Sequence, residues 1–264
     1  MKICRVSVND ELFFGVLEGL DANGEPGDET VIAILEGHPF NGINPDGRFV
    51  RYQDVRLVAP VLPSKIVAIG KNYAAHAAET NLGEVPSEPL MFLKPSTSVV
   101  GPGDPIILPW QSELVEHESE LAIVIGRVCA EVPKERAHEV IFGFTCANDL
   151  TARDLQHADV QWTRAKSFDT FCPLGPWIET ELDWEDVSIQ CRVNDVLKQD
   201  GTSLDMVFDV ASIIEAVSSV MTLLPGDVIL TGSPAGTGPI TAGDNVSVTI
   251  SGIGTLKNPV IDRE

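Results

Sequence analysis

Short runs of apolar and β-branched residues recur along most of this chain, and they restrict it to a strand-rich fold. Each run has the length of a β-strand rather than of a helix, and turn-forming residues separate one run from the next. From Lys65 onward the runs read KIVAIG, DPIILP, ELAIVIG, EVIFGFTCAND, SIQCRVND, DVILTG and NVSVTISG. Two other segments show helical spacing, NYAAHAAE and DVASIIEAVSSVMTL. We therefore expect an α+β fold dominated by strands.

The N-terminal part of the chain differs from the rest. Its strands are short, and polar turns such as DANGEPGDE separate KICRVSV, ELFFGVLEG and TVIAILEG. The character of the sequence changes after APVLPS. We predict a small β-rich N-terminal domain over residues 1–57 and a main domain over residues 58–264.

Acidic residues outnumber basic ones by 39 to 18 in this chain of 264 residues, which gives a formal net charge of −21. Phosphate backbones and anionic lipids repel such a polyanion, so we expect neither nucleic acid nor a membrane as a partner. No apolar run approaches the roughly 20 residues that span a bilayer. The start, MKICRVSVNDELFFG, lacks the features of a signal peptide. We expect a cytoplasmic protein in which an anionic ligand would need local positive charge.

The cysteines are widely spaced and odd in number, and they include no C-x-x-C pair. We therefore expect reduced structural thiols, with neither a disulfide framework nor a thiolate zinc site. The five are Cys4, Cys129, Cys146, Cys172 and Cys191.

Three glutamates alternate in the segment EHESELAIVIG, where an acidic stretch runs directly into an apolar strand. On one strand Glu116, Glu118 and Glu120 would share a face, because successive side chains point in opposite directions. A charged edge-strand face exposed to water is one interpretation. The other is that Glu118 and Glu120 supply two oxygen ligands to one hard cation.

A third carboxylate follows the next apolar strand in FGFTCANDLTARDLQ. Asp149 either caps a helix or completes a metal site with Glu118 and Glu120. We expect Thr151 to cap a short helix on which Arg153 and Gln156, three residues apart, lie on the same side. Three carboxylates with open coordination positions are typical of a Mg²⁺ or Mn²⁺ site.

The segment GKNYAAHAAE predicts a short helix with Asn72 as its cap. His76 and Glu79 would then be neighbours, and a carboxylate beside an imidazole raises its basicity, as a general base for water requires. A surface His/Glu pair is the alternative. Because this alanine-rich helix would pack weakly, it could also act as a movable lid.

Two lysines and one loop complete the candidate site. Lys94 in FLKPSTS and Lys166 in TRAKSFDTFCPLGP are flanked by apolar residues, so either could neutralise the carboxylates instead of pointing to solvent. The strand DVIL ends in TGSPAGTGP, where backbone N–H groups and the Ser233 hydroxyl could hold a carboxylate.

Taken in order, these segments resemble the fumarylacetoacetate hydrolase family over roughly residues 60–260. The resemblance implies a mixed β-roll domain, an expected homodimer, and a Mg²⁺ or Mn²⁺ held by Glu118, Glu120 and Asp149. With it in view, we expect catalytic roles for three residues and substrate-binding roles for four. The catalytic set is His76, Glu79 and Lys166, and the substrate-binding set is Arg153, Gln156, Lys94 and Ser233.

The implied activity is metal-dependent cleavage of a C–C bond beside a 2-oxo acid, through an enolate. The short N-terminal segment favours the smaller family members, and the loop TGSPAGTG departs from the TGTPxGVG that members often carry. We expect oxaloacetate decarboxylation to pyruvate and CO₂, with acylpyruvate hydrolysis close behind. An isomerase acting on an unsaturated 2-oxo diacid and a non-catalytic binding protein remain open.

Overall fold

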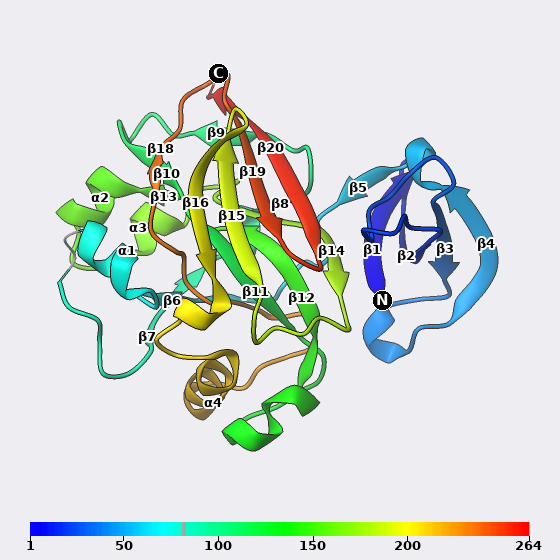
Figure 1. The fold of residues 1–264 in the computed structure, drawn as a ribbon, viewed down its shortest axis with the longest axis horizontal. Helices are drawn as coiled ribbons and strands as arrows, with labels where there is room; N and C mark the ends of the chain where they lie inside the picture. Colours follow the sequence, from blue (N-terminus) through cyan, green and yellow to red (C-terminus); the bar gives the residue numbers. More distant parts are fainter. Residues whose placement is uncertain (81–82, 264) are drawn as a thin grey trace.

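A computed structural model describes residues 1–80 and 83–263 of the chain. Strands dominate it, in three sheets of twelve, five and three strands among the described residues. The expected α+β fold with its excess of strand is confirmed (Figure 1). No helix within these residues is long and apolar enough to cross a membrane.

The largest sheet runs from the N-terminal strands through the centre of the molecule. Its order is β4-β3-β2-β1-β14-β12-β11-β17-β6-β7, with β5 beside β1 and β8 beside β14. The strands are β1 Lys2–Val8, β2 Glu11–Glu18, β3 Val31–Leu35, β4 Pro45–Arg51, β5 Arg56–Val58, β6 Ile66–Gly70, β7 Leu90–Lys94, β8 Val99–Val100, β11 Ser119–Ile125, β12 Ile141–Asn148, β14 Cys172–Glu179 and β17 Val228–Leu230.

The N-terminal strands lie to one side of the main body (Figure 1). They join it where β1 pairs with β14 through Lys2↔Glu179 and Ile3↔Ile178. The predicted boundary at residue 57 falls inside β5, which pairs with β1. The division into two domains at that residue stays a prediction.

Two smaller sheets complete the main body. The five-stranded sheet has the order β16-β15-β19-β20-β9, and the three-stranded sheet the order β13-β10-β18. Their bounds are β9 Ile106–Leu108, β10 Val115–His117, β13 Thr151–Ala152, β15 Ser188–Val193, β16 Val196–Thr202, β18 Gly238–Pro239, β19 Asn245–Ile250 and β20 Gly254–Asp262.

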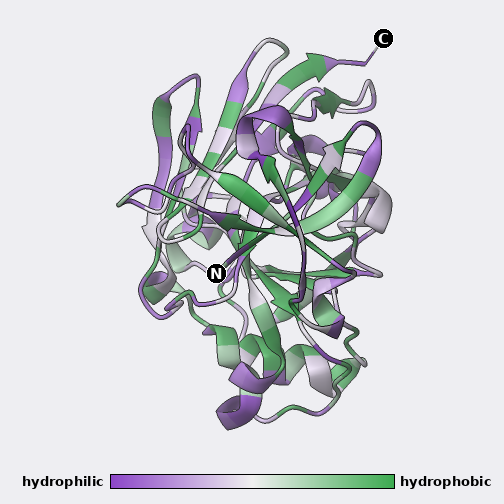
Figure 2. Ribbon diagram, turned by 90° about the vertical axis from the view of Figure 1, so that its right-hand side faces the viewer, coloured by the Kyte–Doolittle hydropathy of each residue, from purple (hydrophilic) through white to green (hydrophobic). Residues whose placement is uncertain are grey.

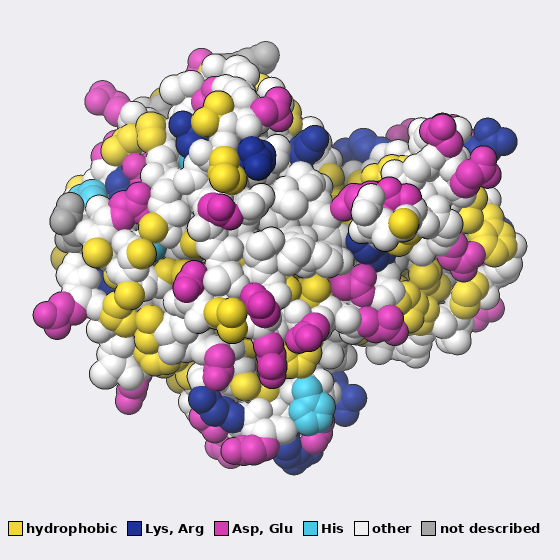
Figure 3. Space-filling view, viewed as in Figure 1, with side chains coloured by type: hydrophobic (Ala, Val, Ile, Leu, Met, Phe, Trp, Pro, Cys, Tyr) yellow, Lys and Arg dark blue, Asp and Glu magenta, His cyan; other side chains and the backbone are white. Residues whose placement is uncertain are grey.

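Strand β11 shows why the run ELAIVIG is apolar without a break. Leu121, Ile123 and Ile125 point into a core shared with the five-stranded sheet and the longest helix. Ala122 and Val124 point into a second core, on the opposite face. Because the strand is buried on both faces, alternation disappears from its sequence. Hydrophobic colour follows the central strands, and acidic side chains are scattered over the outer surface (Figures 2 and 3).

The helices are short, except for one. The α-helices are α1 Ala74–Glu79, α2 Arg153–Ala158, α3 Thr163–Lys166 and α4 Val210–Val220, and the 3-10 helices are Pro39–Asn41, Tyr52–Asp54, Ser96–Ser98, Lys134–Glu139 and Ser203–Asp205. Both predicted helical segments are confirmed. In α4 the cap is Asp209, whose carboxylate accepts a hydrogen bond from the Ser212 N–H.

The predicted caps of the two other helices are wrong. Helix α1 begins after Tyr73, and the Asn72 amide instead donates to the carbonyl oxygens of Phe208 and Thr231. Helix α2 begins after Ala152, and the Thr151 hydroxyl donates to the Asp149 carbonyl. In both cases the polar side chain satisfies a buried backbone group, and this takes the place of a local cap.

Candidate active site

Three buried carboxylates meet where strands β11 and β12 pair. Glu118 lies between β10 and β11, Glu120 lies on β11, and Asp149 directly follows β12. The Asp149 N–H donates to the Glu118 carbonyl over 2.8 Å, which fixes the two backbones together. One oxygen from each carboxylate lies within 4.8 Å of the others. Exposures of 4%, 2% and 1% rule out the exposed edge-strand interpretation.

Glu116, the remaining glutamate of the alternating row, pairs with Arg153 and is not one of the three converging carboxylates. Glu116 accepts a hydrogen bond from Arg153 Nε over 2.7 Å, and Arg153 Nη2 lies 2.5 Å from Glu118 Oε1. Arg153 also donates to the Gln156 side chain, on the same side of α2 as predicted. The guanidinium therefore joins two glutamates that would otherwise repel each other.

Two lysines approach Asp149 from opposite sides. Lys166, the last residue of α3, places Nζ 2.6 Å from Asp149 Oδ2 and 2.8 Å from Glu118 Oε2. Lys94 places Nζ 2.6 Å from Asp149 Oδ1. Lys94 does not line the cavity described below, although we expected it to bind substrate. Its ammonium group instead contacts the Asp149 carboxylate and the backbone carbonyl oxygens of Lys166 and Leu150.

Burial and the neighbouring charges shift the pKa values of Glu118 and Glu120 in opposite directions. Burial opposes the ionisation of Glu118, but Lys166 and Arg153 outweigh it, and the pKa of Glu118 is lowered. Burial and the charge of Asp149 raise the pKa of Glu120 well above its usual value, although Lys166 acts in the opposite direction. Glu120 also accepts a hydrogen bond from the Gly232 N–H over 2.6 Å.

This group of ligand atoms fits a divalent metal ion. All three are carboxylate oxygens, the ligands that hard cations such as Mg²⁺ and Mn²⁺ prefer. They converge from separate segments on one point, and a cation there would offset both causes of the raised pKa of Glu120, its burial and the negative charge of Asp149. Glu118, Glu120 and Asp149 would therefore hold the ion.

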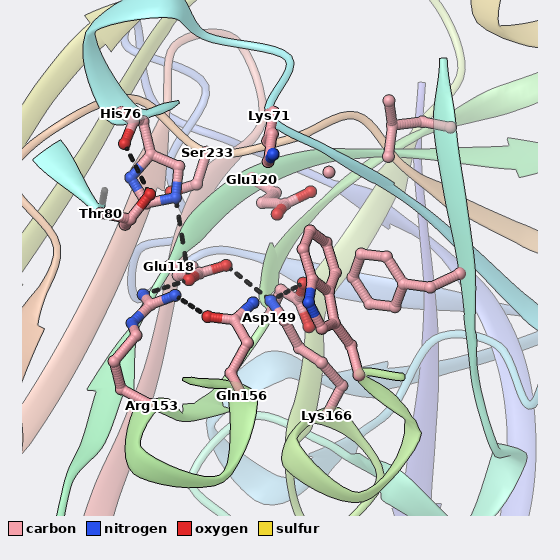
Figure 4. Close-up of a pocket in the computed structure, with 14 residues that line it drawn as sticks. Lys71, His76, Thr80, Glu118, Glu120, Asp149, Arg153, Gln156, Lys166 and Ser233 are labelled. Carbon is pink, nitrogen blue, oxygen red and sulfur yellow. Dashed lines mark hydrogen bonds and ion pairs between the residues drawn. The ribbon is translucent and has the colours of Figure 1, made fainter. Parts of the chain in front are cut away.

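Helix α1 brings the predicted His/Glu pair to the site. His76 is buried, and its Nε2 lies 3.8 Å from Glu118 Oε1 (Figure 4). Its Nδ1 lies 3.5 Å from Glu79 Oε2. Glu79 does not line the cavity. It accepts hydrogen bonds from the Gly236 N–H over 3.0 and 3.1 Å, which connects α1 to the loop that carries Ser233.

The cavity among these residues has an empty volume of about 330 Å³, which includes space open to solvent. His76, Arg153, Gln156, Lys166 and Ser233 line it together with the three carboxylates, as Figure 4 shows. Six further lining residues were not predicted from the sequence, and they are Ile69, Gly70, Lys71, Thr80, Phe92 and Trp162.

Lys71 and Trp162 meet at the turn that follows strand β6, and the sequence indicates this turn only weakly. Lys71 directly follows the buried strand β6 and has a positive φ of 58°, an unusual conformation for a residue other than glycine. Gly70 precedes it, and a Cβ there would lie 2.5 Å from the Trp162 ring. A polar turn after a buried strand was thus a place to search for more site residues.

The comparison with known families identifies the chain. The model for the fumarylacetoacetate (FAA) hydrolase C-terminal domain matches residues 65–261, and that for an Rv2993c-like N-terminal domain matches residues 1–60. The chain belongs to the fumarylacetoacetate hydrolase family. The resemblance found in the sequence is thereby confirmed.

Individual family members with several named activities are similar to this chain. An oxaloacetate decarboxylase from Dictyostelium discoideum is 42% identical, over 72% of this chain and 90% of that protein. An oxaloacetate tautomerase from Xenopus laevis is also 42% identical, over 79% of this chain and 69% of that protein. Both are named as mitochondrial.

Two solved structures share the whole architecture. A 5-carboxymethyl-2-hydroxymuconate delta-isomerase from Mycobacterium smegmatis has a TM-score of 0.92 at 49% identity, with 100% of both chains covered. A maleylpyruvate hydrolase from Sphingobium, in complex with manganese(II) and pyruvate, has a TM-score of 0.79 at 31% identity, again with 100% of both chains covered. This family member thus binds a divalent metal together with a 2-oxo acid.

Proposed function

We propose that this chain is a cytoplasmic, metal-dependent enzyme that decarboxylates oxaloacetate to pyruvate and CO₂. The observation that carries the proposal is the convergence of three buried carboxylates, the cationic side chains of Arg153 and Lys166, and His76 on one cavity. A divalent cation held by the carboxylates would supply a Lewis acid for the 2-oxo group and the enolate. The relative that binds manganese(II) and pyruvate supports both the divalent cation and a 2-oxo acid as ligands of this site.

The cationic side chains retain donors for a carboxylate. Among the described residues, the hydrogen bonds of Arg153 engage three of its five N–H groups, and those of Lys166 engage two of its three. The remaining donors, with the amide of Gln156 and the hydroxyl of Ser233, would orient the substrate. Loss of CO₂ leaves the electron pair of the broken bond on C3, and His76 would deliver a proton there.

Positive charge in the cavity suits an anionic substrate. Lys71, Arg153 and Lys166 line the cavity together with the three carboxylates. A divalent ion held by the carboxylates would add two positive charges, and the carboxylates of oxaloacetate would neutralise them.

Two other reactions use the same residues. In acylpyruvate hydrolysis, His76 with Glu79 would activate water for attack on the distal carbonyl, as the maleylpyruvate hydrolase relative suggests. In tautomerisation or isomerisation, His76 would move a proton without bond cleavage, as the names of two other relatives suggest. We also expect a homodimer, which light scattering in solution would test.

Product analysis separates these activities. The purified protein would receive oxaloacetate, an acylpyruvate or an unsaturated 2-oxo diacid with Mg²⁺ or Mn²⁺, and CO₂, pyruvate and carboxylic acid would be followed separately. We expect CO₂ and pyruvate in equal amounts from oxaloacetate, and from the variant Glu118→Ala no more than forms with the metal ion alone. Loss of absorbance without CO₂ would instead establish a tautomerase or isomerase, and full activity in excess chelator would refute metal dependence.

A further inference from the structure

Gln199 is a buried side chain that connects two walls of the cavity without lining it. It lies on β16 and has 0% exposure. Its Oε1 is 3.0 Å from the Ser119 backbone nitrogen and 2.9 Å from His117 Nδ1. Its Nε2 is 2.7 Å from Ser233 Oγ and 2.7 Å from the Pro234 carbonyl oxygen.

Two backbone groups determine which way this amide points. The Ser119 N–H can only donate a hydrogen bond, and the Pro234 carbonyl can only accept one. The oxygen of Gln199 must therefore face Ser119, and its nitrogen must face Pro234. The same reasoning shows that His117 carries its proton on Nδ1, because its partner is the amide oxygen.

The orientation of Gln199 determines the hydrogen-bonding role of Ser233. Since Nε2 is a donor, Ser233 Oγ accepts from it, and the hydroxyl proton of Ser233 stays available for another acceptor. The nearest alternative is the Pro234 carbonyl at 3.5 Å, at the limit of a hydrogen bond. Ser233 lines the cavity with the three carboxylates. Its proton is thus available to an anionic group bound there.

The same amide also holds the metal-facing wall in place. His117 and Ser119 are the two neighbours of Glu118 in the chain, and both bond to Gln199 Oε1. Behind the other wall, a Cβ on Gly201 would lie 2.5 Å from Pro234, so β16 packs closely against the Ser233 loop. One side chain therefore bonds both to the chain neighbours of Glu118 and to Ser233.

We propose that Gln199 is a positioning residue, which presents the Ser233 hydroxyl as a hydrogen-bond donor to a carboxylate of the bound 2-oxo acid. Gln199 acts through Ser233 and does not touch the substrate. The inference rests on the proposed function for the class of substrate, but not for the reaction that follows binding.

The test measures the binding of oxalate, a small dicarboxylate, to Mg²⁺-loaded protein by calorimetry. Gln199→Met removes the donor to Ser233 at similar size, and we expect about tenfold weaker oxalate binding, the usual loss for one hydrogen bond to a charged group. Ser233→Ala should lose about the same amount, and Ser233→Thr should retain parental affinity. Affinity for Mn²⁺ alone should stay within about threefold in both Ser233 variants, because they leave the metal-facing carboxylates and the chain neighbours of Glu118 unchanged.

A double variant tests whether Gln199 acts through Ser233. In the Ser233→Ala background, Gln199→Met should change oxalate affinity less than about twofold. Gln199→Glu provides a second variant in case the methionine does not fold, because it keeps an acceptor for the Ser119 N–H. Asp200→Asn is the matched control: it also exchanges an acid and an amide, on the exposed neighbour in β16, and should leave binding unchanged.

Additive losses in the double variant, or unchanged oxalate binding in both Gln199 variants, would overturn the inference. So would a metal-loaded parent that does not bind oxalate. If oxalate binding depends on Gln199 and Ser233 as described but oxaloacetate is not consumed, the inference stands and only the proposed function fails.

Discussion

Lys94 and Asp149 form an ion pair that is almost completely shielded from water. Nζ and Oδ1 lie 2.6 Å apart, and the two side chains are 0% and 1% exposed. Because Asp149 also contacts Lys166 through its other oxygen, its charge is compensated on both sides. Lys94 thus neutralises a carboxylate of the site, which is one of the roles that its apolar flanks suggested.

Replacing Lys94 by Met should destabilise the protein by about 3 kcal/mol, because removing one partner leaves a buried charge less compensated. Urea unfolding of the metal-free protein measures the loss. Lys134→Met provides the control, since Lys134 lies 3.8 Å from Asp209 and is 44% exposed. That change should cost less than about 1 kcal/mol. Equal losses in the two variants would contradict the structural role of Lys94.

His76→Ala should lower kcat for oxaloacetate by a factor of about 10² to 10⁴, the usual contribution of a general acid or base. Glu79→Gln should lower it less, since Glu79 orients the imidazole from outside the cavity. Steady-state kinetics at saturating Mn²⁺ measures both changes. An unchanged kcat in His76→Ala would remove this residue from the chemistry.

Metal binding should release a proton from Glu120. Burial and the negative charge of Asp149 raise its pKa, so the carboxyl is protonated below that pKa and must ionise to bind a cation. Affinity for Mn²⁺ should therefore rise with pH until the raised pKa is passed. Calorimetry in two buffers of different ionisation enthalpy counts the released protons. In Glu120→Gln both the proton release and this pH dependence should disappear, and their persistence would assign them to another group.

Gly236→Ala should be far more disruptive than Gly243→Ala. Both glycines have a positive φ, 97° and 95°. A Cβ on Gly236 would lie 2.1 Å from the Lys198 carbonyl oxygen, whereas nothing lies within 4 Å at Gly243. The strained φ should cost about 1 to 2 kcal/mol in both variants, and the clash adds to it only at Gly236. Melting temperatures and kcat together measure the difference, and equal effects would argue against the tight packing of this loop.

Four cysteines should resist alkylation in the folded protein. Burial raises the pKa of Cys4, Cys146, Cys172 and Cys191 to about 12. Mass spectrometry after iodoacetamide at pH 8 should show at most one modified thiol, at the half-buried Cys129, and five after denaturation. Rapid native modification of a second cysteine would contradict the packing around it.

The same shifts predict how stability changes in alkaline solution. A thiol with a raised folded pKa ionises more readily in the unfolded chain, whose thiol pKa is near 9.0. Its contribution to stability is complete below that value and is lost as the pH rises toward 12. Urea unfolding between these pH values should show a steep decrease, and substitution of the four thiols by Ala should make the decrease shallower.

Local patterns were sufficient to predict the carboxylates and the longest helix. Alternation placed Glu118 and Glu120 together, and the spacing of apolar residues indicated α4 with Asp209 at its start. Strand β4 was missed because it is an exposed edge strand, so few of its side chains are apolar. A strand with little buried surface leaves little pattern in the sequence.

Long-range contacts could not be predicted in this way. Asn72 and Thr151 have the residue types of helix caps, but distant or irregular backbone groups use their side chains instead. From the sequence, Lys94 looked equally suited to binding the substrate and to neutralising a carboxylate of the site. Gln199 carried no local signal, since its partners lie 34 to 82 residues away in the chain.

The antiparallel pairing of Ser119 with Asn148 and of Glu120 with Ala147 has a consequence for how mutations act on this enzyme. A slip of one residue would turn every β11 side chain to the opposite face and carry Glu120 away from the other carboxylates. The geometry of the active site thus depends on the register between strands β11 and β12. An insertion or deletion within either strand would inactivate the enzyme even if every active-site residue were retained.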